Sequence, residues 1–309
     1  MGKIQAISVS DRKGVIKENV DAAFFENDFG IKGDAHAGKW HRQVSLLALE
    51  SVKKMQEKGL KVKSGDFAEN ITTEGIDLLS FPVGTKLQIG SIELIISQIG
   101  KVCHHKCAVY YHAGECVMPK EGIFGVVRGN GELHVGDEIK NLGKDGYSVG
   151  IITLSDRASK GEYEDLTGPA VEKYISENLK TSFIRKEIIA DDKDKLNITL
   201  KDFADIQMLD LIITNGSTGI SPRDIAPDVT IEVIEKRLSG FEEVMRAESF
   251  KITVNSIVSR AVCGTRKNSL IINLPGSPKG AVENLSFIMP VIEHTIKKLQ
   301  GDKSDCAVR

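Results

Sequence analysis

The sequence has few of the features that mark a membrane or secreted protein. Its 309 residues contain no uninterrupted apolar run that reaches the roughly 20 residues needed to cross a bilayer. The N-terminal stretch lacks the long apolar core of a secretory signal, so we expect a cytoplasmic protein. Internal repeats and low-complexity tracts are also absent, and the composition, with 41% hydrophobic residues, is typical of a folded globular chain.

A surplus of basic residues is missing too. The 41 lysines and arginines oppose 43 acidic residues, and residues 1–145 carry 19 of each sign. This balance excludes a basic surface for nucleic acid or for an anionic membrane. A small anionic ligand would therefore have to be held by local loops and a metal ion, which indicates a pocket.

The cysteines do not suggest a disulfide framework, because five is an odd number and the chain is large. Three thiols and three imidazoles fall within 14 residues: Cys103, His104, His105, Cys107, His112 and Cys116. Such donors suit zinc, iron or molybdenum-sulfur chemistry. A Cys-x3-Cys spacing is less diagnostic than paired Cys-x2-Cys motifs, so incidental thiols are an equal alternative.

The length favours two domains, since 309 residues are more than one core usually serves. The segment 141–146 is rich in glycine and charge, and the hydrophobic pattern changes across it. We therefore predict domains at residues 1–142 and 147–303.

The second half alternates short β-branched runs with amphipathic segments, which predicts a three-layer α/β/α domain with a mostly parallel sheet. Strands are expected at 148–154, 183–189, 209–214 and 269–274, and helices at 168–179, 196–205, 227–238 and 280–299. The first half instead has short strands broken by glycines, which predicts a β-barrel or sandwich. Its expected strands are 4–9, 86–89, 92–98 and 138–141, with one helix at 46–58.

Three predicted strands of the second half end in loops suited to phosphate. We call them the first loop (154–157), the glycine loop (214–224) and the third loop (274–280). Glycines let backbone N–H groups approach an anion, and a following helix presents its positive end. One such loop is also ordinary turn chemistry, but three on strands of one domain favour anion binding.

The motifs of these loops resemble the molybdopterin-binding family, which includes molybdopterin adenylyltransferases. They are Ser-Asp-Arg at 155–157, Gly-Ser-Thr-Gly to Pro-Asp at 216–228, Ser259-Arg260, and Leu-Pro-Gly-Ser-Pro-Lys-Gly at 274–280. The resemblance spans about residues 147–300. It implies transfer of AMP from ATP to molybdopterin with Mg²⁺, release of pyrophosphate, and a homotrimer formed through the C-terminal domain.

The resemblance also assigns residues. Asp191 and Asp224 match the family's acidic catalytic residues and would hold Mg²⁺, with Asp192 as a substitute for Asp191 and helix capping as the alternative role. The implied substrate-binding residues are Ser155, Asp156, Arg157, Gly216, Ser217, Thr218, Gly219, Arg223, Pro275, Gly276, Ser277 and Lys279. The family's loop reads Thr-Thr-Gly-Gly-Thr-Gly, whereas Asn215 and Ser217 replace a Thr and a Gly here. A cofactor carrier without catalysis is therefore the rival hypothesis.

The first half resembles the MOSC domain, named for the C-terminal domain of molybdenum-cofactor sulfurases. Its motifs are Gly-Asp-Ala-His-Ala-Gly at 33–38, Arg-Gln-Val-Ser at 42–45 and Gly-Asp-Phe-Ala-Glu-Asn-Ile-Thr at 65–72. The resemblance implies a β-barrel that binds or modifies the molybdenum cofactor or its sulfur, with Cys103 as the characteristic cysteine. A metal site with Cys107 and Cys116, and a pocket lined by His36 and His41, are further hypotheses.

The leading hypothesis is thus an enzyme of molybdenum-cofactor biosynthesis whose first domain accepts, modifies or guards the product. A metal or sulfur transfer protein centred on Cys103–Cys116 is a third hypothesis. The expected ligands are a pterin and a nucleotide, and other molybdenum-cofactor proteins are the expected partners. The sequence does not distinguish a molybdenum from a tungsten cofactor.

Overall fold

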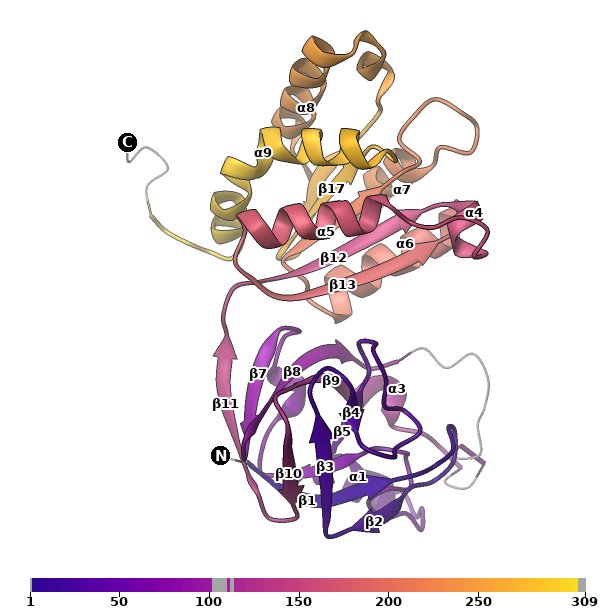
Figure 1. Cartoon of the computed structure of the whole chain (residues 1–309), viewed down its shortest axis with the longest axis vertical. Helices are drawn as coiled ribbons and strands as arrows, with labels where there is room; N and C mark the ends of the chain where they lie inside the picture. The colour runs from indigo at the N-terminus through magenta and orange to yellow at the C-terminus, as the bar shows by residue number, and fades with distance from the viewer. Residues whose placement is uncertain (1, 102–109, 112–113, 305–309) are drawn as a thin grey trace. The chain divides into compact units, whose positions relative to one another are not determined.

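The chain folds into two units, Met1–Asp145 and Gly146–Arg309 (Figure 1). The computed structural model describes residues 2–101, 110–111 and 114–304. Within these ranges no helix is both long and apolar enough to cross a membrane.

The N-terminal unit is a closed seven-stranded β-barrel over the part of the chain that the structure describes. Its strands follow the order β11-β7-β8-β9-β5-β6-β1, and β1 closes the ring by pairing with β11. Their bounds are β1 Gly2–Val9, β5 Val44–Ala48, β6 Ile71–Glu74, β7 Thr85–Ile89, β8 Ile92–Ile99, β9 Ile123–Arg128 and β11 Glu138–Lys144. Closure leaves few unpaired strand edges, and apolar side chains such as Ile7, Leu46 and Leu94 are fully buried.

Smaller elements surround this barrel. Strand β2 (Glu18–Val20) pairs with β1, and a separate sheet follows the order β10-β3-β4. The remaining bounds are β3 Ala22–Glu26, β4 Gly30–Ile31, β10 Gly131–His134, α1 Leu49–Glu57, η1 Leu78–Ser80 and α3 Met118–Glu121. Helix α1 buries Val52 and Met55 in a cluster with Phe67, which attaches the helix to the barrel.

The C-terminal unit contains a mixed sheet in the order β13-β12-β14-β17-β16-β15. The first four strands are parallel, while β16 and β15 are antiparallel additions at one edge. The bounds are β12 Tyr147–Leu154, β13 Thr181–Ile189, β14 Leu211–Asn215, β15 Lys236–Arg237, β16 Cys263–Arg266 and β17 Ser269–Leu274. Seven of the eight residues of β12 are buried, as expected for a strand covered on both faces.

Helices cover both faces of this sheet (Figure 1). On one face α5, α8 and α9 bury apolar side chains such as Val171, Met245 and Leu285 against Ile151 and Ile213. On the other face lie α6 and α7. The helix bounds are α4 Asp156–Ser159, α5 Thr167–Asn178, α6 Lys193–Lys201, η2 Asp202–Ile206, α7 Ala226–Val233, α8 Ser239–Ile252, η3 Val254–Val258 and α9 Pro278–Leu299.

Several predicted element boundaries are wrong. The predicted helix 46–58 begins only at Leu49, because residues 46–48 pair with β6 inside the barrel. The predicted helix 227–238 ends at Val233, because Lys236 and Arg237 pair with β16. The predicted strand 138–141 continues to Lys144, into the segment expected to form the domain boundary, with an irregularity in the pairing between Asn141 and Gly143.

Candidate functional site

The three predicted phosphate loops begin side by side at one edge of the C-terminal sheet. Thr153 at the end of β12 lies opposite Asn215 at the end of β14, and Asn215 lies opposite Leu274 at the end of β17. Because these strands are adjacent and parallel, the residues that follow them emerge at the same edge, where ligands of such sheets are held. The structure therefore brings together residues that are up to 125 positions apart in the sequence.

The glycine loop leaves β14 through two residues in the left-handed region, Gly216 at φ +99° and Ser217 at φ +58°. A Cβ on Gly216 would lie 2.6 Å from the main-chain oxygen of Leu154. A Cβ on Gly276 would lie 3.2 Å from the Cα of Gly216. The first and third loops thus approach the glycine loop too closely for larger residues at these positions.

Arg260 donates hydrogen bonds to main-chain carbonyl groups of the glycine loop. Its main-chain N–H donates to Thr218 O (2.9 Å), and its Nε donates to Gly219 O (2.7 Å). One of its Nη groups donates to Asp224 O (2.6 Å), and the guanidinium also pairs with Asp228 at 2.8 Å.

The N–H groups of the same peptides are left available. In a planar trans peptide N–H and C=O point in opposite directions, so the N–H groups of Gly219 and Ile220 point away from Arg260. The carbonyl of Ser217 accepts from Ala226 N (3.1 Å), which directs the N–H of Thr218 away in the same manner. Among the described residues these three N–H groups have no acceptor. A row of unpaired donors is a concavity suited to an anion.

The first loop contacts the end of β13 and the glycine loop through the side chain of Asp156. Ser155 caps α4, its Oγ accepting from Ala158 N at 3.1 Å. The Asp156 carboxylate accepts from the main-chain N–H of Asp191 (3.1 Å) and lies 3.4 Å from Nη1 of Arg223. One carboxylate therefore bridges the first loop, the end of β13 and the glycine loop.

The two predicted catalytic aspartates are half-buried on this edge of the sheet. Asp224 accepts a hydrogen bond from Ser221 N (2.7 Å). Asp192, the predicted substitute for Asp191, is the N-cap of α6 and accepts from Lys195 N at 3.0 Å. Helix capping therefore occupies Asp192, while the Asp191 carboxylate has no donor among the described residues.

The third loop ends at the N-terminus of α9, a helix of 22 residues. Ser277 caps this helix, its Oγ accepting from Gly280 N at 3.2 Å. Gly276 O accepts from Thr167 Oγ1 (2.7 Å), which fixes the loop against the start of α5. The Lys279 side chain is exposed, and its Nζ lies 3.8 Å from Glu283. The positive end of a long helix and an exposed cation thus border the site.

A cavity of about 300 Å³ adjoins the loops. Four predicted binding residues line it: Thr218, Gly219, Pro275 and Ser277. The opposite wall comes from α8, η3 and α9. Arg246, Ser249, Asn255, Ser256 and Asn284 give it polar side chains, beside the apolar Met245 and Val258. The Oγ of Ser249 is buried and has no hydrogen-bond partner in the described part of the chain. The cavity therefore offers polar groups to a ligand that extends from the loops.

Two residues of the site were missed from the sequence. Asp165 accepts from Thr153 Oγ1 (2.7 Å) and from the N–H groups of Thr167 and Gly168, so it fixes the start of α5 at the loop edge. An aspartate two residues before Thr167 and its helix could have indicated this cap. Arg260 was part of a quoted motif, but its contact with Gly219, 41 residues away, has no local signal.

Asn215 and Ser217, the two residues that differ from the family's loop, lie in different surroundings. Asn215 is 1% exposed, and neither atom of its amide has a partner among the described residues. Ser217 instead points into its own loop, where its Oγ accepts from Ile225 N (2.8 Å) and donates to Arg223 O (3.1 Å).

Most of the predicted Cys/His site lies outside the described residues, namely Cys103, His104, His105, Cys107 and His112. Cys116 is half-buried and packs against the apolar cluster around α1. Within the described ranges no three His, Cys, Asp or Glu side chains gather as metal ligands would. His41 Nε2 hydrogen bonds to Gln98 Oε1 at 2.8 Å, and His36 lies beside Asp34.

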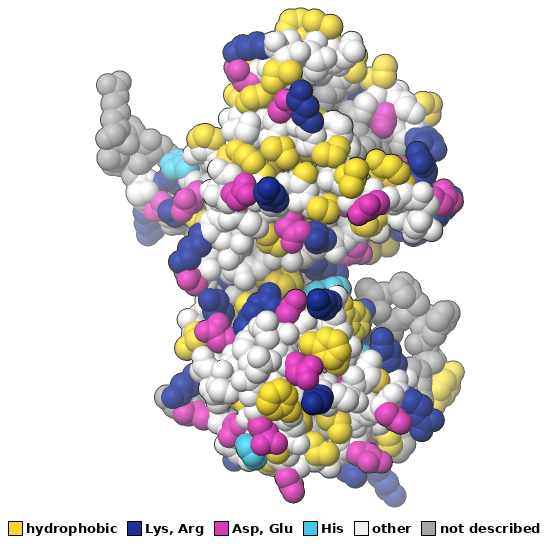
Figure 2. Space-filling view, viewed as in Figure 1, with side chains coloured by type: hydrophobic (Ala, Val, Ile, Leu, Met, Phe, Trp, Pro, Cys, Tyr) yellow, Lys and Arg dark blue, Asp and Glu magenta, His cyan; other side chains and the backbone are white. Residues whose placement is uncertain are grey.

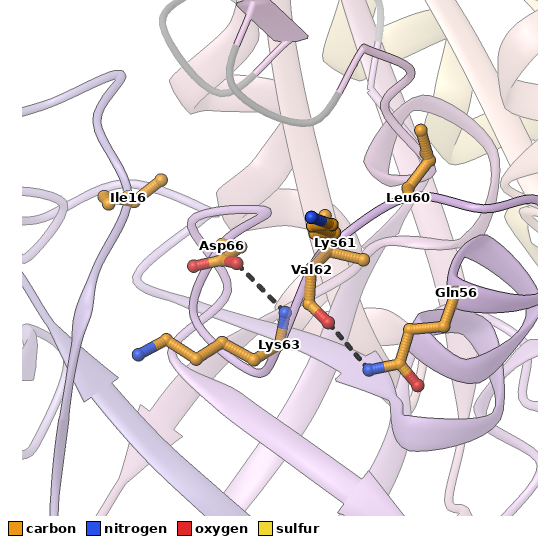
Figure 3. Close-up of a pocket in the computed structure, with 7 residues that line it drawn as sticks. All are labelled: Ile16, Gln56, Leu60, Lys61, Val62, Lys63 and Asp66. Carbon is orange, nitrogen blue, oxygen red and sulfur yellow. Dashed lines mark hydrogen bonds between the residues drawn. The ribbon is translucent and has the colours of Figure 1, made fainter.

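The N-terminal unit also has an open cavity of about 490 Å³ beside α1 (Figure 3). Two hydrogen bonds order its wall: Gln56 Nε2 donates to Val62 O (2.7 Å), and Lys63 N donates to Asp66 Oδ2 (3.0 Å). None of the predicted site residues lines it.

Comparison with known proteins matches both halves of the chain. Residues 150–294 match the model of the probable molybdopterin binding domain, and residues 33–140 match the MOSC domain. The molybdopterin adenylyltransferase of Helicobacter pylori J99 is 42% identical over 155 residues, which are 50% of this chain and 88% of that protein. The enzyme of the same name from Escherichia coli K12 is 38% identical over 141 residues, covering 45% of this chain and 72% of that protein.

Among solved structures, the molybdopterin biosynthesis enzyme MoaB from Thermus thermophilus is 37% identical. The match covers 50% of this chain and 98% of that one, with a TM-score of 0.47. From the family match and the two adenylyltransferases, the chain belongs to the molybdopterin-binding family that includes the molybdopterin adenylyltransferases, and it carries a MOSC domain before that region.

Proposed function

We propose that residues 147–303 transfer AMP from ATP to the terminal phosphate of molybdopterin, and that residues 1–142 bind or modify the resulting cofactor or its sulfur. The observation that carries this proposal is the row of unpaired N–H groups on Thr218, Gly219 and Ile220, beside a cavity lined in part by polar side chains. The 42% identity to a molybdopterin adenylyltransferase supports the choice of substrates.

The reaction needs little covalent help from the protein. An oxygen of the molybdopterin phosphate attacks the α-phosphorus of ATP, the bond to the β-phosphate oxygen breaks, and pyrophosphate leaves with the electron pair. The protein must hold the attacking oxygen in line and neutralise the charge on the α-phosphate and the leaving group. Preorganised N–H donors do this without rearranging, because the contacts of Arg260 already fix the loop.

The carboxylates fit a magnesium ion that arrives with the nucleotide. Mg²⁺ usually takes one or two protein carboxylates and completes its shell with water and substrate phosphates. Asp191 and Asp224 would hold it, and neither belongs to a cage of three acidic ligands in the described part of the chain. The bound ion would neutralise charge on the transferred and leaving phosphates.

The other predicted residues surround the phosphates in this proposal. Thr218, Gly219 and Ile220 contribute main-chain N–H groups, Ser217 shapes the loop that presents them, and Arg223 and Lys279 contribute side-chain cations. The remaining substrate-binding residues are Ser155, Asp156, Arg157, Gly216, Pro275, Gly276 and Ser277.

The direct test is pyrophosphate release from ATP by the full chain. We expect release that requires both molybdopterin and Mg²⁺ and falls by about 100-fold or more in Asp224→Ala, since a group that stabilises developing charge is worth that much. Glu232→Ala is the matched control, because Glu232 is an exposed carboxylate near the C-terminal end of α7, whose N-terminal end follows the glycine loop. Unchanged turnover in Asp224→Ala would contradict the assigned role of that residue.

A carrier that binds the cofactor without catalysis is the second candidate, and Asn215 favours it. Its buried, unpaired amide differs from the threonine that the resemblance leads us to expect. Tight molybdopterin binding with no nucleotide turnover in the native chain would select the carrier.

The role of the first domain rests on the MOSC match. Sulfur and metal analysis of the purified full chain, compared with Cys103→Ser, tests it. We expect the variant to lose cofactor-derived sulfur or metal, and an identical content in both proteins would exclude a role for Cys103.

A further inference from the structure

Ser217 occupies a backbone conformation that a serine adopts at a cost. At φ +58° it follows Gly216 at φ +99°, and left-handed backbone is disfavoured for any residue with a Cβ. A serine that persists there must be stabilised by its own contacts.

The Ser217 hydroxyl makes those contacts on both sides of Asp224. It accepts from the N–H of Ile225 (2.8 Å) and donates to the carbonyl of Arg223 (3.1 Å). The main-chain oxygen of Ser217 adds a third bond, from Ala226 N at 3.1 Å. The segment 217–226 is thus closed into a ring by one residue, and a glycine could make only the last of these bonds.

The ring restrains Asp224 from one side while other contacts restrain it from the other. Arg260 donates to the carbonyl of Asp224 (2.6 Å), and Ser221 N donates to its carboxylate (2.7 Å). The hydroxyl holds Arg223 and Ile225, the two neighbours of Asp224. Its loss would therefore let the peptides on either side of Asp224 rotate. The same rotation would move Arg223, whose guanidinium reaches Asp156.

We propose that the Ser217 hydroxyl is a positioning group that sets the direction of the Asp224 carboxylate for adenylyl transfer. This inference rests on the proposed function of the C-terminal domain. In it, the serine does not obstruct the ligand, because its side chain faces the loop's own backbone and leaves the N–H groups of residues 218–220 available.

Three substitutions of Ser217 separate the effect of losing the hydroxyl from the effect of backbone strain. Ser217→Gly removes both, Ser217→Ala removes the hydroxyl and keeps the strain, and Ser217→Thr keeps the hydroxyl but adds a β-branch that left-handed backbone tolerates poorly. Ser217→Gly is therefore expected to be the most stable of the three variants and Ser217→Thr the least stable, with Ser217→Ala between them. Activity is expected in a different order, with Thr above both Ala and Gly.

The measurements are kcat, the KM for ATP, the Mg²⁺ concentration that gives half-maximal rate, and unfolding by urea, all on the full chain. In Ser217→Gly and Ser217→Ala we expect kcat to fall between about 10- and 100-fold, as for a misplaced reacting group. The required Mg²⁺ concentration is expected to rise, while the KM for ATP changes by less than about threefold. Ser176→Ala, which removes an exposed hydroxyl on α5, is the control.

If the Ser217 hydroxyl has a purely structural role, we expect the opposite result. Activity would then follow stability, and Ser217→Gly would be at least as active as the native chain with the same Mg²⁺ requirement, which overturns the proposal. Absence of transfer by the native chain would instead contradict the proposed function, so the two failures are distinguishable.

Discussion

Lys17 and Asp34 form a buried ion pair in the N-terminal unit. Their side chains are 0% and 1% exposed, and Nζ lies 2.6 Å from Oδ2. Burial disfavours the charged carboxylate, but the hydrogen bond from His36 and the charge of Lys17 outweigh it and hold the pKa of Asp34 below its usual value. Asp34 belongs to the Gly33–Gly38 motif of the MOSC resemblance, and Lys17 holds it from outside that motif.

Lys17→Met should lower the free energy of unfolding by about 3–5 kcal/mol, because it leaves a buried carboxylate without its cation. Urea denaturation at pH 7 measures this, with Lys17→Met/Asp34→Asn as the control that removes both charges. The double variant is expected to be more stable than the single one. A double variant less stable than Lys17→Met would contradict the pairing.

The same pair predicts a dependence on pH. Since the pKa of Asp34 is lower in the folded state than its ordinary 3.8, its contribution is complete above that value and is lost as the pH falls toward the folded-state pKa. The native chain should therefore lose more stability than Lys17→Met/Asp34→Asn when the pH is lowered from 5 to 3. Equal losses would show that Asp34 is not responsible.

At the scale of elements, the glycine loop depends on Gly216. A methyl group there would meet Leu154 O at 2.6 Å, and φ +99° disfavours any residue with a Cβ. Gly216→Ala should therefore displace the loop and lower kcat for adenylyl transfer by about 10-fold or more. Enzyme kinetics on the full chain measure this.

Gly136→Ala is the matched control, because Gly136 has a nearly equal φ of +96° with no atom within 4 Å of its added Cβ. It should cost about 1–2 kcal/mol of stability through backbone strain alone and leave kcat unchanged. If Gly216→Ala resembled this control in kcat, the close approach of the loops would be unimportant for catalysis.

Elements with a regular apolar pattern could be predicted from the sequence, and others could not. Strands β12, β14 and β17 have uninterrupted buried runs, which identified them and the loops that follow. Helix α8 was missed because its buried positions include Glu242 and Ser249 beside Met245, so no apolar stripe repeats along it. Glu242 is buried because Arg237 and Cys263 N donate to it, a tertiary arrangement that no local pattern reveals.

The site, too, could be predicted only in part from the sequence. The loop motifs indicated which segments meet at the sheet edge, because parallel neighbours end together. The direction of the Ser217 side chain could not be predicted, since it depends on Arg223 and Ile225 folding back over six to eight residues. That Asp192 rather than Asp191 caps α6 also needed the structure, because either could have done so.

At the scale of the whole molecule, the trimer remains a prediction from the resemblance. Hydrophobic side chains lie at the top of the C-terminal unit, over the end of α8 (Figure 2). In α8 and η3, Phe250, Ile252, Val254 and Ile257 are 47 to 65% exposed, and such a group of exposed apolar side chains favours contact with another protein surface. We expect light scattering to give the mass of three chains, and Phe250→Glu/Ile257→Glu to shift it toward one chain.

The control for this shift is Ile198→Glu on α6, an equally exposed apolar side chain outside the group. It should leave the mass unchanged. A native chain with the mass of a single copy at micromolar concentration would contradict the trimer.

The chain joins a MOSC domain to a molybdopterin-binding domain, and the proposed chemistry of the second is the most important claim to test. Mass spectrometry of the products formed by the full chain from molybdopterin, ATP and Mg²⁺ tests that claim most directly. We expect adenylylated molybdopterin and one pyrophosphate per product, with both lost in Asp224→Ala and retained in Glu232→Ala. Bound molybdopterin recovered unchanged from the native chain, with ATP intact, would contradict it.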